Sequence, residues 1–132
     1  MNLKEFLKLN PPNNKYVFGR YIKYCRESQY NKSVRAMAQE LGLTASYLSD
    51  IENGKRYAPF KILPRFIQVF EIQEDEKQDF MDLAYLTKGK GFPDLSEYLW
   101  KHPTARQAVR KAMEKDLSGE DFLAIVESVI EK

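Results

Sequence analysis

SVRAMAQELGLTASYLSDIENGKR, residues 33–56, is the stretch of sequence that decides the fold of this chain. Its apolar residues recur at the three- and four-residue spacing of a helix until Gly42, which can adopt the left-handed conformation that ends a helix. Thr44 then supplies an N-cap, and Leu48 and Ile51 form the apolar stripe of a second helix that ends at an Asn-Gly pair. The stretch therefore predicts two short helices joined by a tight turn.

This arrangement resembles the helix-turn-helix of lambda-repressor-like (Xre family) DNA-binding proteins. The resemblance covers about residues 16–70 and implies an all-α bundle that binds double-stranded DNA. The alternative is a helical hairpin that serves only as core, in which case the outward residues of the second helix would be arbitrary. The resemblance is clearest at Met37-Ala38, Gly42-Leu43, Tyr47-Leu48-Ser49, Ile51-Glu52 and Gly54-Lys55.

The second helix of such motifs lies in the major groove, with its N-terminal residues against base edges. By position in the resembling motif, Ala45, Ser46 and Asp50 are expected to face bases. The serine can donate or accept, the aspartate can accept from a cytosine amino group, and the alanine methyl can contact a thymine methyl. This set contains no arginine or glutamine that could make two hydrogen bonds to one base, so we expect DNA shape to supply part of the specificity.

The resemblance also implies contacts with phosphates before and after the recognition helix. Ser33 is expected to cap the first motif helix and to present the N–H groups of that helix to a phosphate. Val34 stands where many relatives carry glutamine, and its side chain cannot donate the corresponding hydrogen bond. The residues expected at phosphates are Lys32, Ser33, Arg35, Tyr47, Lys55 and Arg56.

The family often pairs a carboxylate at the position of Glu52 with an arginine of the preceding helix, and Arg26 is the candidate here. Ordinary surface exposure of both is the alternative, because the loop at residues 28–32 is one residue longer than is typical. If the pair is buried, removing either partner should cost about 3–5 kcal/mol.

Composition favours a cytoplasmic protein. The chain has 132 residues with 43% hydrophobic content, enough for one substantial core or two small ones. The first residues, MNLKEFLKLN, contain charges and no long apolar run, which argues against a signal peptide or a membrane span. The single cysteine, Cys25, is in step with the apolar residues of its helix and is expected to be a buried small hydrophobe.

The net charge of +2 hides an asymmetry between the two halves of the chain. Residues 1–70 hold 12 Lys and Arg against 5 Asp and Glu, whereas residues 71–132 hold 9 against 14. A charge bias without function is the alternative explanation. Because the basic half contains the helix-turn-helix, we expect that half to meet DNA and the acidic half to face away from it, toward protein.

Three segments are expected. Residues 1–14 are a short amphipathic helix and a linker at 10–14, residues 15–70 are the DNA-binding domain, and residues 71–132 are a helical extension for dimerisation or partner binding. Helices are expected at about 17–28, 63–70, 74–86 and 94–101. Thr104 with Gln107, and Ser118 with Asp121, have the spacing of capping boxes at the starts of two further helices.

A single motif touches few base pairs, so we expect a homodimer on a symmetric site with half-sites about 34 Å apart. The last helix has a continuous apolar stripe, which is the candidate interface together with two aromatic residues. The alternative is that these residues fold back on their own domain. The candidate interface residues are Tyr98, Trp100, Phe122, Ile125, Val126, Val129 and Ile130.

The function expected from these features is a sequence-specific transcription regulator that acts as a repressor. The alternative is an antitoxin whose second half neutralises a toxin while the first half controls their joint promoter. An enzyme is not expected, because the only histidine, His102, has no cysteine cluster or second histidine to complete a metal site or a triad. We accordingly expect no catalytic residues, no metal and no cofactor.

Overall fold

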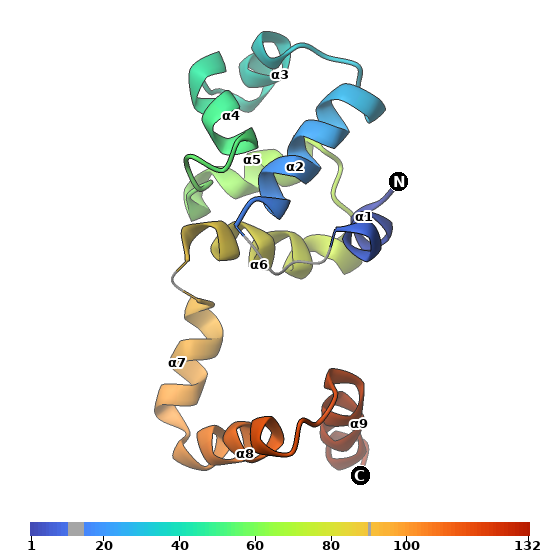
Figure 1. Ribbon diagram of the computed structural model, residues 1–132, viewed down its shortest axis with the longest axis vertical. Helices are drawn as coiled ribbons and strands as arrows, with labels where there is room; N and C mark the ends of the chain where they lie inside the picture. The colour runs from blue at the N-terminus through green and yellow to red at the C-terminus, as the bar shows by residue number, and fades with distance from the viewer. Residues whose placement is uncertain (11–14, 90) are drawn as a thin grey trace. The chain divides into compact units, whose positions relative to one another are not determined.

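The computed structural model describes residues 1–10, 15–89 and 91–132, and every regular element within these ranges is helical, which confirms the all-α fold (Figure 1). The chain divides into two compact units, Met1–Phe92 and Pro93–Lys132. The expected linker at 10–14 falls mainly on residues 11–14, which lie outside the described residues. The α-helices are α1 (Leu3–Leu9), α2 (Val17–Tyr24), α3 (Val34–Leu41), α4 (Ala45–Glu52), α5 (Leu63–Val69), α6 (Lys77–Lys88), α7 (Pro93–Lys101), α8 (Pro103–Glu114) and α9 (Gly119–Ile130).

Helices α3 and α4 are the two helices expected from the central stretch, and both begin at the predicted caps. Ser33 Oγ accepts a hydrogen bond from the N–H of Ala36, and Thr44 Oγ1 accepts one from the N–H of Tyr47, each at 3.1 Å. Gly42 ends α3 with a φ of 73°, in the left-handed region where a side chain would be strained. Local chemistry therefore determines both ends of the turn.

Helix α2 continues into a π-helical turn, Cys25–Gln29, where a regular α-helix was expected to reach about residue 28. The N–H of Tyr30 donates to the carbonyl oxygen of Cys25 at 3.0 Å, five residues earlier. A π-helical turn takes up an additional residue. This turn contains the buried side chain of Arg26.

Helices α2 and α4 approach one another closely at Gly19. A Cβ atom added there would lie 2.4 Å from the carbonyl oxygen of Ile51 and 2.5 Å from that of Glu52. These distances are far below van der Waals contact, so only glycine fits the observed crossing. The position of α4 on the domain thus depends on a glycine in a different helix.

The core of the first unit extends beyond residues 15–70 at both ends. The ring of Phe6 in α1 lies 5.1 Å from that of Tyr21, and the ring of Phe18 lies 5.1 Å from that of Phe80 in α6. Burial of side chains of this size stabilises a fold by about 1.5–3 kcal/mol each. The core residues that α1 and α6 add are Leu3, Phe6, Phe80, Leu83 and Ala84.

An acidic residue joins α1 to the start of α6. The buried carboxylate of Glu76 accepts a hydrogen bond at 3.0 Å from the N–H of Lys4, in the first turn of α1, and Figure 1 shows α1 beside that end of α6. Residues 71–92 are therefore part of the first compact unit, although they belong to the acidic half of the sequence. The functional division into 1–14, 15–70 and 71–132 stays a prediction.

The second unit consists of α7, α8 and α9. Ser118 caps α9 by accepting from the N–H of Asp121 at 3.1 Å, as the spacing predicts. The predicted cap at Thr104 is wrong, because α8 begins at Pro103 and Thr104 already lies inside its first turn. Proline is favoured in the first turn of a helix, and its fixed φ starts α8 there.

Candidate nucleic-acid interface

Helix α4 presents one face to the core and the opposite face to solvent. Leu48 and Ile51 are fully buried and hold the helix against the first unit. Ala45 and Ser46 are exposed, and Asp50 is half-buried. The three residues expected to read bases therefore lie on α4 outside its buried stripe.

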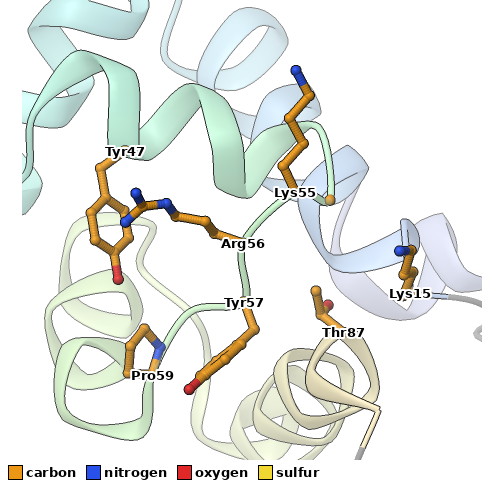
Figure 2. A pocket seen from close by; sticks show the side chains of 8 residues that line it. Lys15, Tyr47, Lys55, Arg56, Tyr57, Pro59 and Thr87 are labelled. Carbon is orange, nitrogen blue, oxygen red and sulfur yellow. The ribbon is translucent and has the colours of Figure 1, made fainter.

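The candidate base reader Asp50 and two candidate phosphate ligands lie together at the end of α4. Arg56 Nε lies 3.3 Å from Asp50 Oδ2, and the guanidinium of Arg56 lies 4.9 Å from the centre of the Tyr47 ring. Figure 2 shows the arginine side chain extended toward this ring. Arg56 thus balances the negative charge of Asp50, which would otherwise be repelled by DNA phosphates.

A pocket of about 420 Å³ lies beside this cluster (Figure 2). Its walls come from the segment before α2, from α4 and the segment after it, and from the end of α6. The cations of Lys15, Lys55 and Arg56 line it, and the ammonium of Lys88 lies 5.1 Å from the centre of the ring of Tyr57, another lining residue. Basic and aromatic groups around an open pocket suit a phosphate oxygen.

Three lining residues with polar side chains were not among the expected site residues. They are Lys15, Tyr57 and Thr87, and the hydroxyl of Thr87 donates to the carbonyl oxygen of Leu83 at 3.2 Å. No spacing in the sequence connects residues 15, 57 and 87. The weak local signals were a lysine just before a helix and a tyrosine just after Lys55 and Arg56.

The remaining candidate phosphate ligands lie near the start of α3 and do not line this pocket. The ammonium of Lys32 lies 2.5 Å from the carboxylate of Glu40, so this cation is already paired within the domain. Ser33 uses its hydroxyl oxygen as the cap of α3. Arg35 is exposed, and it forms no ion pair within the described part of the chain.

The candidate ion pair between Arg26 and Glu52 forms in the interior. Arg26 Nε donates to Glu52 Oε2 at 2.7 Å, and Nη2 donates to Oε1 at 2.9 Å. Only 9% of the arginine side chain and 4% of the glutamate side chain are exposed. Hydrogen bonding to Glu52 raises the pKa of Arg26, so the guanidinium stays charged, and the contact connects the π-helical turn after α2 to the end of α4.

The candidate interface residues all lie in the second unit, and most of them are exposed. Trp100 is 79% exposed with the guanidinium of Arg106 5.7 Å from the centre of its ring, and the ring of Tyr98 lies 4.4 Å from that of His102. Phe122 is half-buried. The others, all in α9, are between 40% and 75% exposed: Ile125, Val126, Val129 and Ile130.

Comparison with known proteins identifies one region of the chain. The family model described as helix-turn-helix, of the Xre or lambda-repressor-like class, matches residues 22–77, from within α2 to the first residue of α6. Among the curated proteins and the solved structures, none matches this chain. Within residues 1–10, 15–89 and 91–132, the helices are too short or too polar to cross a membrane.

Proposed function

We propose that residues 22–77, which match the helix-turn-helix family model, are a DNA-binding domain, and that the protein is a transcription repressor that binds a specific double-stranded site as a homodimer. In this proposal α4 enters the major groove with Ala45, Ser46 and Asp50 toward the bases. Occupying a promoter is enough for repression, and no further activity is needed.

The observation that carries this proposal is the pocket lined by Lys15, Lys55 and Arg56 at the end of α4. Phosphate contacts set the register of a recognition helix, and contacts between residues near its N-terminus and base edges supply the specificity. The exposed Ser46 lies in the first turn of α4, whereas the pocket cations Lys55 and Arg56 follow its last turn. The two kinds of contact are thus expected from opposite ends of one short helix.

Selection of bound fragments from random DNA tests the proposal with the full chain. We expect enrichment of one roughly palindromic sequence, with an affinity that falls as salt rises because counterions are released from the phosphates. Lys55→Ala should weaken binding to all sequences and reduce the slope of log affinity against log salt by about 0.9. Lys8→Ala, an exposed lysine of α1, is the matched control and should leave both quantities unchanged.

Absence of an enriched sequence would contradict the regulator proposal. A specific site whose affinity ignores salt would contradict the proposed phosphate contacts.

An antitoxin that represses its own promoter is the second candidate, and the exposed apolar side chains of α9 favour it, because a toxin could cover them. This candidate predicts a tight complex with the product of a neighbouring gene. It also predicts that the purified chain is monomeric until that product is added, which distinguishes it from the homodimer.

A further inference from the structure

The second unit has no core of its own. All 40 of its residues are described, and none of them is buried. Ten of its large apolar side chains are more than a third exposed, from Leu95 in α7 to Ile130 at the end of α9. A unit of this size with exposed apolar side chains and no buried residue would gain stability from a partner surface that covers them.

Two apolar grooves of this unit are formed by α8, α9 and the turn between them. One has a volume of about 490 Å³, and the other about 720 Å³. Both grooves are lined by residues from each of the two helices. A helix with an apolar face can fill such a groove. The first groove is lined by apolar side chains, including Ala108, Ala112, Phe122 and Val126, and by the lysines Lys111 and Lys115.

The two helices carry opposite charges. Helix α8 has three basic residues and one acidic residue, whereas α9 has three acidic residues and no basic one. Lys111 and Lys115 are four residues apart, and so are Glu127 and Glu131 at the end of α9. These four side chains are exposed and form no ion pairs with any residue the structure describes.

We propose that the groove of about 490 Å³ receives α9 of a second copy of this chain, with Glu127 and Glu131 of each copy facing Lys111 and Lys115 of the other. A two-fold axis repeats the contact, so two α8–α9 pairs form a four-helix bundle. A contact made by α9 alone would lack these opposite charges, because α9 has three acidic residues and no basic one. This proposal rests on the proposed function, because a palindromic site requires two copies, and it identifies the surface that joins them.

The test measures the mass of the full chain by light scattering and its dimer dissociation constant by sedimentation equilibrium. We expect twice the 15.5 kDa of one chain at micromolar concentration. The variant Lys111→Glu/Lys115→Glu should raise the dissociation constant about tenfold or more, because like charges then meet in both copies of the contact. Glu127→Lys/Glu131→Lys should have the same effect.

Combining all four substitutions restores opposite charges and should return the dissociation constant to within about threefold of the wild-type value. Lys8→Glu/Lys61→Glu changes the net charge by the same amount at exposed positions of the first unit, and it should leave the dimer intact.

A monomeric wild-type chain would overturn the proposal and leave the groove to another protein. A four-substitution variant that stays monomeric would also overturn it. Titration of the same samples with the selected DNA separates dimerisation from DNA recognition. A monomer that still binds that sequence contradicts the bundle and the homodimer but not specific DNA binding, whereas a dimer that selects no sequence contradicts specific DNA binding but not the bundle.

Discussion

Replacing Arg26 with alanine would remove the cation from a buried ion pair and leave the carboxylate of Glu52 without its partner. The substitution deletes two hydrogen bonds to that carboxylate and a third, of 2.9 Å, from Arg26 Nη1 to the carbonyl oxygen of Lys32. Because so little of either side chain is exposed, water cannot replace these contacts without opening the structure. Breaking a buried pair in this way costs about 3–5 kcal/mol.

Thermal unfolding followed by circular dichroism measures this loss. A destabilisation of 1 kcal/mol lowers the Tm of a domain of this size by about 4–8 °C, so Arg26→Ala should lower it by at least about 12 °C. Glu27→Ala is the matched control, because Glu27 lies 4.0 Å from the same guanidinium but is half exposed. Its loss should cost less than about 1 kcal/mol. A Tm for Arg26→Ala equal to that of Glu27→Ala would refute this reasoning.

Three further predictions concern α2 and α4. Gly19→Ala should destabilise the first unit by about 1–3 kcal/mol, because the new Cβ would meet the backbone of α4. Urea unfolding measures this loss, and a variant as stable as the wild type would mean that the two helices are not so close. Burial raises the pKa of Cys25 to about 11, so the native thiol should react with a disulfide reagent far more slowly at pH 8 than the urea-unfolded chain does; equal rates would contradict its burial. The raised pKa of Cys25 stabilises the folded state below pH 9, and this contribution is lost as the pH rises. The free energy of unfolding should therefore fall between about pH 9 and 11, and it should fall less in Cys25→Ala. An equal fall in the wild type and in Cys25→Ala would assign the loss to other groups.

The sequence was sufficient for features that depend on neighbouring residues. The caps at Ser33, Thr44 and Ser118 and the left-handed Gly42 each follow from a side chain and the few residues beside it. Thr104 had the same local signal, yet the proline before it already starts the helix. Where two local signals compete, the more rigid residue determines the helix start.

Contacts between distant segments were harder to predict. Lys15, Tyr57 and Thr87 meet around one pocket only because α2 and α6 pack together in the first unit. The ion pair between Lys32 and Glu40 likewise depends on how the chain enters α3, and it gives an acidic partner to a cation that the sequence predicts for phosphate. Side-chain periodicity predicts which face of a helix is buried, but not which distant residue lies against it.

We propose that α4 reads bases while the basic pocket holds phosphate. The most direct test compares the wild type with two variants on the selected DNA site. The affinity of each is measured for that site and for every single-base change in it. We expect Ser46→Ala to alter the base preference at one position of each half-site. We expect Lys55→Ala to lower the affinities for all sequences by one common factor. If Ser46→Ala keeps the wild-type preference at every position, or if Lys55→Ala changes it, the proposed roles of the two ends of α4 are contradicted.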